Sequence, residues 1–357
     1  MTSEIGRAGK LLSRRTRRLA YGVIAVSLLF LLDGCYYMQA IRGQMDLMSR
    51  RRPVTEVISD EDSSAELKTK LEMLRDARQF SIDELQLPDN DSYRSYADLE
   101  RDFVVWNVFA APEFSLEPRR WCYPVAGCVA YRGYFAEAAA EKQAQKLQDK
   151  GFDVVVGGVP AYSTLGKFAD PLLNTMMRWS DVELVATLFH ELAHQKLYIK
   201  GDTGFNESFA TAVSDIGMER WLAAQGEQNQ LQDREDERLE RRAGMALIES
   251  AKTKLQQLYS SELEATEMRD RKREILEKLQ ADLAVSAGDA FSGGMNNARL
   301  ASLGLYEGRV DAFRAIFRQC EQQLTCFYQQ TAVLADDSMD ERNAKLNALD
   351  ETETIAP

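Results

Sequence analysis

The two histidines of this 357-residue chain occur together, in Phe189-His190-Glu191-Leu192-Ala193-His194. Side chains four positions apart on a helix project from the same face, so His190 and His194 can bind one metal ion. Ser180 and Glu183 form a predicted capping box before the motif, and Gly201 is suited to end the helix. The sequence therefore predicts a metal-binding helix that runs from Ser180 to about residue 200.

Glu191 adds chemistry to this helix because it lies beside the two histidines. A zinc ion lowers the pKa of a bound water to about 7, and a nearby carboxylate can take its proton as the hydroxide attacks a carbonyl. His190, His194 and Glu191 are thus expected to serve one Zn²⁺ ion, with Glu191 as the general base. Ligand type does not formally exclude manganese, cobalt or nickel.

A catalytic zinc needs a third protein ligand and one open position. The candidate is Glu207, near the start of a second helix predicted from Asn206 to Ala224, which the chain reaches through Gly201 and Gly204. Three other acids are rivals for this role: Asp202, Asp215 and Glu219. Asp215 best suits an orienting role, because it lies about two turns past Glu207 on the same helix face.

Hydrophobic periodicity predicts an α+β fold that is mostly helical. Three apolar stretches read as strands of a small mixed sheet: Phe103–Ala110, Val129–Phe135 and Asp153–Val156. Helices are expected over Ser63–Leu85, Ala136–Lys150 and Asn296–Gln330, and a charged stretch of long helices turns near Ser260. This charged stretch is either a solvated surface or an arm for a protein partner.

These patterns divide the chain into five regions. They are a signal or lipoprotein anchor (1–35), a catalytic region (36–225), a charged helical arm or hairpin (226–285), a helical region completing the catalytic domain (286–335), and a disordered acidic tail (336–357).

The first region favours export. Six basic residues precede an uncharged run from Leu19 to Leu32, which is shorter than the about 20 residues that span a bilayer. The run ends in Leu32-Asp33-Gly34-Cys35, which resembles a bacterial lipobox with Cys35 as the acylated residue, although Asp33 departs from that pattern. An uncleaved signal anchor is the alternative. Either form predicts a membrane-anchored protein of the cell envelope that faces the periplasm, and Tyr36 after Cys35 suits the outer membrane.

Cysteine usage agrees with that compartment. Apart from Cys35, the four cysteines fall into two close pairs that we interpret as disulfides, Cys122 with Cys128 and Cys320 with Cys326. Four buried free thiols in a cytoplasmic protein are the alternative, which the export signal disfavours. The net charge of −12 argues against a nucleic-acid partner, because binding phosphates needs a clustered basic surface.

The zinc motif followed by Asn206-Glu207-Ser208-Phe209-Ala210 resembles the gluzincin metallopeptidases, with a shorter interval before the Asn-Glu pair. More closely, the chain resembles a bacterial family of predicted aminopeptidases, on blocks around the zinc motif and at 121–128, 131–135, 161–166 and 296–300. The resemblance implies a zincin-like core and a peptide substrate. It does not identify the residue that would hold a substrate N-terminus; Asp170 is one candidate.

Two further roles stay open. A tyrosine often stabilises the oxyanion in zinc peptidases, and the candidates are Tyr162, Tyr198 and Tyr306, each of which is also suited to simple packing. The leading hypothesis is a zinc aminopeptidase, with endopeptidase or dipeptide hydrolysis as variants. The alternatives are a non-catalytic, zinc-containing envelope lipoprotein that acts as a scaffold, and a structural zinc protein with a closed coordination sphere.

Overall fold

The computed structural model describes residues 36–123, 127–161, 163–286, 294–306 and 309–354. The chain forms two compact units, Met1–Ser49 and Arg50–Pro357. The described part of the first unit is a helix over residues 36–49. Among the described residues, every helix is too short or too polar to cross a bilayer. The predicted anchor, with Cys35 and the apolar run before it, lies outside the described residues.

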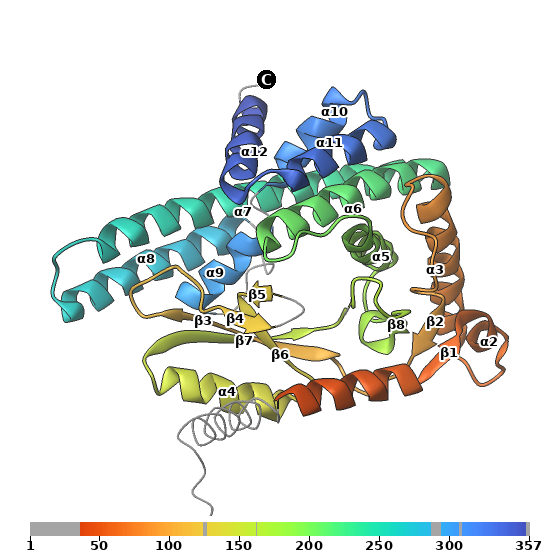
Figure 1. The fold of residues 1–357 in the computed structure, drawn as a ribbon, viewed down its shortest axis with the longest axis horizontal. Helices are drawn as coiled ribbons and strands as arrows, with labels where there is room; N and C mark the ends of the chain where they lie inside the picture. The colour runs from red at the N-terminus through yellow and green to blue at the C-terminus, as the bar shows by residue number, and fades with distance from the viewer. Residues whose placement is uncertain (1–35, 124–126, 162, 287–293, 307–308, 355–357) are drawn as a thin grey trace, which may run out of the picture. The chain divides into compact units, whose positions relative to one another are not determined.

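The three predicted strands form one sheet in the second unit. Its order is β6 (Tyr131–Tyr134), β3 (Val105–Pro112) and β7 (Phe152–Val159), and both pairings are antiparallel. Helix α4 (Glu137–Gln148) covers one face and α9 (Asn297–Tyr306) the other (Figure 1). The central strand β3 is therefore buried on both faces, which explains its nearly continuous apolar sequence.

Two smaller sheets complete the β-structure of the described residues. β1 (Arg51–Pro53) pairs antiparallel with β2 (Ser95–Ala97), and β2 pairs parallel with β8 (Leu172–Leu173). β4 (Trp121–Tyr123) and β5 (Gly127–Val129) form a hairpin. The parallel pairing expected of a mixed sheet thus lies in the small β1–β2–β8 sheet, and the sheet of the three predicted strands is wholly antiparallel.

The two helices of the metal motif pack against each other. α5 (Asp181–Lys196) begins at the predicted capping box of Ser180 and Glu183, and α6 (Thr203–Gln225) ends at Gly226 in the left-handed conformation. α3 (Ala65–Asp83), preceded by the short helix α2 (Val54–Ser59), packs on the other side of α5. α5 ends at Lys196, before the predicted end near residue 200, because Leu197 adopts an extended conformation.

The charged region forms the predicted hairpin. Its helices are α7 (Gln228–Tyr259) and α8 (Ala265–Ser286), and the chain reverses just after Ser260 (Figure 1). The apolar faces of the two helices pack against each other and against Leu300 of α9, in a core that includes Ile248, Leu255, Leu279 and Leu283. Hydrophobic burial therefore joins α8 to the C-terminal half of α7, while the other faces remain charged.

The C-terminal region consists of α10 (Val310–Gln319), α11 (Leu324–Asp336) and α12 (Met339–Thr354). The first two cover α6 through rings at 5–6 Å: Phe313 lies 5.1 Å from Phe205, and Phe327 lies 6.0 Å from Phe209. α12 occupies most of the segment that the sequence predicts as a disordered tail. It is ordered because the Leu346 and Arg342 side chains are buried against the rest of the fold.

These elements confirm a mostly helical α+β fold with small sheets. The predicted helices over 63–85 and 136–150 are present with small shifts at their ends. The single helix predicted over 296–330 is instead divided among α9, α10 and α11. The residues between these helices include Glu321 and Gln322, both with positive φ, which end α10 sharply.

Candidate functional site

The metal-motif helix is held from its apolar face. Leu184, Leu188, Phe189 and Leu192 are at most 1 % exposed, and the Phe189 ring stacks 6.2 Å from Phe80 of α3. Burial of this face leaves the two histidines on the less buried side of α5, where His190 lies 3.2 Å from Glu207 of α6. A heptad-like apolar spacing in the sequence thus decides which way His190 and His194 point.

Two small residues let α6 approach α5 closely. The Ser214 hydroxyl donates to the Ala186 carbonyl oxygen at 2.7 Å. At Gly217, a Cβ atom would lie 2.7 Å from Leu85 Cδ1 and 2.8 Å from Phe189 Cδ2, so only glycine fits without movement of these side chains. Close contact between the helices brings Glu207, on the second turn of α6, within reach of the histidines.

The loop between α5 and α6 is fixed by Asn206. Its side-chain oxygen accepts a hydrogen bond from the Ile199 N–H at 2.7 Å, and its amide donates to the Ile199 carbonyl oxygen at 2.8 Å. Asn206 is 1 % exposed. In the Asn206-Glu207 pair, one residue therefore closes the turn from inside while its neighbour faces the histidines.

His190, His194 and Glu207 meet at one point. The two Nε2 atoms lie 3.1 Å apart, and Glu207 Oε2 lies 3.2 Å from His190 Nε2 and 3.6 Å from His194 Nε2. Three ligand atoms of a tetrahedral ion, with bonds of about 2.0–2.1 Å, would lie about 3.3 Å apart. The three side chains therefore fit a single ion of zinc's size and geometry.

The charges of the site depend on one another. Burial raises the pKa of Glu207, but its hydrogen bonds to His190 and His194 outweigh burial and bring that pKa down to about 2. Burial lowers the pKa of His190, but the bond to Glu207 and the charges of Glu191, Glu207 and Asp215 raise it above its ordinary value. The excess of negative charge around the histidines is the environment that a divalent cation would neutralise.

The acids that rivalled Glu207 have cationic partners. Asp202 accepts from Arg342 at 2.8 and 3.0 Å, Asp215 from Arg234 at 2.9 Å, and Glu219 from Arg314 at 2.7 Å. Among the described residues, no hydrogen bond joins Asp215 to either histidine. The orienting role expected of Asp215 remains a proposal, and here it acts on His190 through its charge. The buried Nδ1 atom of His194 also has no partner among the described residues.

Of the three candidate tyrosines, the structure places one at the site. The Tyr198 ring lies 6.3 Å from the His194 ring and is about half-exposed, and burial together with the charge of Glu207 raises its pKa. Tyr162 lies outside the described residues. For Tyr306, the last residue of α9, only the backbone is described.

Asp170 supports the loop beside the site. Its carboxylate accepts from the Thr164 N–H and hydroxyl, both at 2.8 Å, and its carbonyl oxygen accepts from the Tyr93 N–H at 2.6 Å. Burial raises the pKa of Asp170 to about 6 against these donors, and the charge of Glu191 adds to the rise. Because Asp170 is fully buried, this conformation does not offer its carboxylate to a substrate ammonium group.

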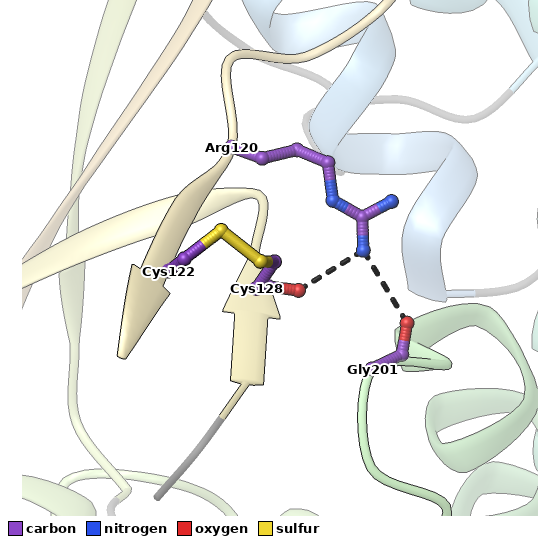
Figure 2. The surroundings of a disulfide bond; sticks show 4 residues. All are labelled: Arg120, Cys122, Cys128 and Gly201. Carbon is purple, nitrogen blue, oxygen red and sulfur yellow. Dashed lines mark hydrogen bonds between the residues drawn. A yellow bond between two sulfur atoms is a disulfide. The ribbon is translucent and has the colours of Figure 1, made fainter. Parts of the chain in front are cut away.

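The first disulfide borders the loop between α5 and α6, residues 197–202, which we call the metal loop. Cys122 and Cys128 are joined across the β4–β5 hairpin, and Arg120 donates to the Cys128 carbonyl oxygen at 3.0 Å and to the Gly201 carbonyl oxygen at 3.4 Å (Figure 2). A Cβ atom on Gly127 would lie 3.1 Å from Lys200 Cε. The hairpin thus packs directly against the loop between the two ligand helices. The second predicted disulfide, Cys320 with Cys326, is also present.

Comparison with known proteins identifies a family for this chain. The family model described as Putative aminopeptidase matches residues 35–346, from the predicted lipid-bearing cysteine into α12. The chain belongs to this family. No curated protein and no solved structure matches it. Membership of the aminopeptidase family points to a peptidase acting on peptide substrates, and the family match includes every residue of the site.

Sequence patterns predicted the three residues that meet at this point but missed what holds them. Asn206 was visible beside Glu207, although nothing in its spacing indicates that it folds back on Ile199. The partner of Asp202 lies 140 positions away at Arg342, in a segment whose acidic composition predicts disorder. Such pairings follow from the packing of α12 on α10, which no local pattern encodes.

Proposed function

We propose that this chain is a zinc-dependent peptidase of the cell envelope, in which His190, His194 and Glu207 hold one Zn²⁺ ion. The observation that carries the proposal is the triangle of ligand atoms, with sides of 3.1, 3.2 and 3.6 Å. Its size matches a tetrahedral ion with one position left over. The resemblance to the gluzincins supports the same function, as does the peptidase activity that family membership suggests.

When bound, the ion would polarise the scissile carbonyl and lower the pKa of a water molecule. Glu191 takes the proton of the attacking water and returns it to the leaving amine. Its place next to His190 in the chain and its electrostatic influence on the His190 ring support this role.

Stabilisation of the oxyanion needs a further donor. Tyr198 is the candidate tyrosine whose ring lies beside His194, and the residue is 39% exposed. Tyr162 and Tyr306 remain proposals for the same role. Tyr198→Phe removes only the hydroxyl, so a fall in kcat without a change in metal content would assign the role to Tyr198.

Exopeptidase action is proposed from the family, with the ammonium-binding group still to be found. Asp170, Asp202 and Asp215 are all engaged by donors within the protein. Matched peptides with a free or an acetylated N-terminus distinguish the two modes. An aminopeptidase cleaves only the free form and releases single residues, whereas an endopeptidase cleaves both.

The envelope location is supported by the two disulfides, which form and persist in oxidising compartments. We propose Cys35 as the lipid-bearing residue. Labelling with a palmitate analogue in cells is expected for the wild-type protein and to be lost in Cys35→Ser. Labelling that survives this substitution would contradict acylation at this position.

The direct test compares the full-length protein, purified in detergent, with three variants. Wild type is expected to hold one zinc ion and cleave a mixed peptide library. Glu191→Gln should keep the metal without cleaving, and Glu207→Ala should lose the metal. Glu219→Gln is the matched control, because Glu219 is an acid on the same helix that contacts Arg314; this variant should keep both the metal and the cleavage activity. Zinc without cleavage would instead support a zinc-containing scaffold, and a wild type without metal would refute the proposal.

A further inference from the structure

An ion pair between remote parts of the chain, Arg342 with Asp202, lies at the end of the metal loop. The Arg342 guanidinium donates twice to Asp202 Oδ2, from Nε at 3.0 Å and from Nη2 at 2.8 Å. The two side chains are 4 % and 8 % exposed. Arg342 belongs to α12, whereas Asp202 is the residue from which α6 begins.

Asp202 uses both carboxylate oxygens. Oδ2 receives Arg342, while Oδ1 accepts from the Phe205 N–H at 3.1 Å and so caps the N-terminus of α6. The Asp202 N–H also donates to the Ile199 carbonyl oxygen at 3.2 Å, next to the bonds that Asn206 makes. Asp202, together with Asn206, therefore sets the direction in which α6 starts and the position of Glu207.

Arg342 is itself held in place by other elements. Its Nη1 atom donates to the carbonyl oxygens of Leu334, Ala335 and Asp337, which end α11, at 2.8 to 3.4 Å. Its guanidinium carbon lies 5.4 Å from the centre of the Phe205 ring. One guanidinium group thus joins the end of α11, the start of α12 and the cap of α6.

Stability alone is a weak reason for such a pair. Taking two charges out of water costs several kcal/mol, and well-packed apolar residues often stabilise a fold as well as a buried ion pair does. What the pair does supply is position, because a planar guanidinium fixes both distance and angle. Asp202 lies on the short loop that separates the two histidine ligands from the glutamate ligand.

We propose that Arg342 is a positioning residue for the third metal ligand: by holding Asp202, it fixes the start of α6 and the reach of Glu207 toward His190 and His194. The C-terminal helix α12 is then a working part of the metal site. This inference rests on the metal site proposed above, and it extends that site to a segment remote in sequence.

The test measures zinc affinity of the full-length protein by competition with a chromogenic chelator. Arg342→Met is expected to weaken zinc binding by about 10- to 100-fold, the usual effect of losing support behind a metal ligand. Its Co²⁺ form should also show an altered visible absorption spectrum, since Glu207 moves. Asp202→Asn, which keeps the cap on Phe205 but loses the charge, should show a smaller change in the same direction.

Lys272→Met is the matched control. Lys272 of α8 forms a partly buried ion pair with Asp153 of β7 at 2.6 Å, with the side chains 10 % and 19 % exposed, and this pair joins α8 to β7. It should lower thermal stability yet leave zinc affinity and the Co²⁺ spectrum within about twofold of wild type, consistent with independence of distant sites.

The outcomes separate the two proposals. Arg342→Met with wild-type zinc affinity and an unchanged Co²⁺ spectrum overturns the positioning role while the metal site stands. Equal weakening in Lys272→Met also overturns it, because the effect would then be general destabilisation. If Arg342→Met does not fold, Asp202→Asn decides in the same way. A wild type that binds no zinc overturns the metal site and, with it, this inference.

Discussion

Glu207 Oε2 lies 3.2 Å from His190 Nε2 and 3.6 Å from His194 Nε2, and Glu207 and His190 shift each other's pKa. In the metal-free protein, the hydrogen bond between Glu207 and His190 favours a protonated His190. A metal ion needs the same nitrogen without its proton. Protons and metal therefore compete for His190, and Glu207, with a pKa of about 2, stays ionised throughout the accessible range.

This competition predicts a pH dependence of zinc affinity. The pKa of His190 is raised above its ordinary value, so below that pKa the ring binds a proton, and the bound proton stabilises the metal-free fold. This contribution to stability is lost as pH rises through the raised pKa. Zinc affinity should be constant above it and fall up to about tenfold per pH unit below it. Chelator competition from pH 8 to pH 5 measures this, and a flat affinity would contradict it.

Asn206 leads to a second prediction at the residue scale. Asn206→Ala removes both side-chain bonds to Ile199, and should cost about 1–3 kcal/mol of unfolding free energy and weaken zinc binding about tenfold or more. Asn174→Ala is the matched control, because Asn174 likewise bonds the backbone at Leu99 N and Arg101 O. Urea unfolding and zinc titration together should show similar destabilisation of both variants, with loss of zinc affinity in Asn206→Ala alone.

At the scale of elements, the ligand helices were predictable and their connection was not. The capping box at Ser180 and the apolar face of α5 are local signals, so the helix start agrees with the sequence. The helix ends at Lys196, before Gly201, because the Asn206 side chain bonds both the N–H and the carbonyl oxygen of Ile199 and holds residues 197–202 out of the helix. Such side-chain to backbone bonds compete with helix propensity and are decided by packing.

The β4–β5 hairpin leads to a prediction about disulfides. Both disulfides close loops with a sequence separation of 6, so removing either should cost about 2 kcal/mol in the chain-entropy account. Only Cys122–Cys128 supports the metal loop, through Arg120 and Gly201. Replacing this pair with serines should speed zinc release, and the Cys320/Cys326 double serine variant should not. Equal release rates at matched stability would contradict a role for the hairpin.

At the scale of the whole molecule, the sequence block at residues 296–300 has a structural role, which its Asn297 shows most clearly. Asn297 is fully buried; its amide donates to the carbonyl oxygens of Pro112 and Glu113, and its side-chain oxygen accepts from the Tyr259 hydroxyl at 2.7 Å. It thereby joins α9, the end of β3 and the α7–α8 hairpin. These contacts span distant parts of the chain, which explains why the resemblance could identify the block without explaining it.

This junction gives a prediction for stability. Asn297→Ala leaves two carbonyl groups and the Tyr259 hydroxyl without their partner, and should lower the unfolding free energy by about 2–4 kcal/mol. Zinc affinity of the folded variant should equal that of wild type. Urea unfolding followed by zinc titration tests both statements, and a loss of zinc affinity would show that the hairpin and the metal site are coupled.

The fold class, and the meeting of His190, His194 and Glu207, could be predicted from the sequence, because helix periodicity, strand composition and the histidine spacing are local. The antiparallel sheet, the ordered α12 and the contacts of Asp202, Asp215 and Asn297 could not, because each depends on residues far apart in the chain. The acidic composition of residues 336–357 obscured the one arginine that is buried there, Arg342.

The most direct test of the central claim is a crystal structure of the zinc-loaded protein with anomalous scattering measured at the zinc edge. The account predicts a single peak about 2.0–2.2 Å from Nε2 of His190, Nε2 of His194 and an oxygen of Glu207, with its fourth position open to solvent. A peak bound by a fourth protein ligand would make the zinc structural, and a peak elsewhere, or none, would contradict the proposed site.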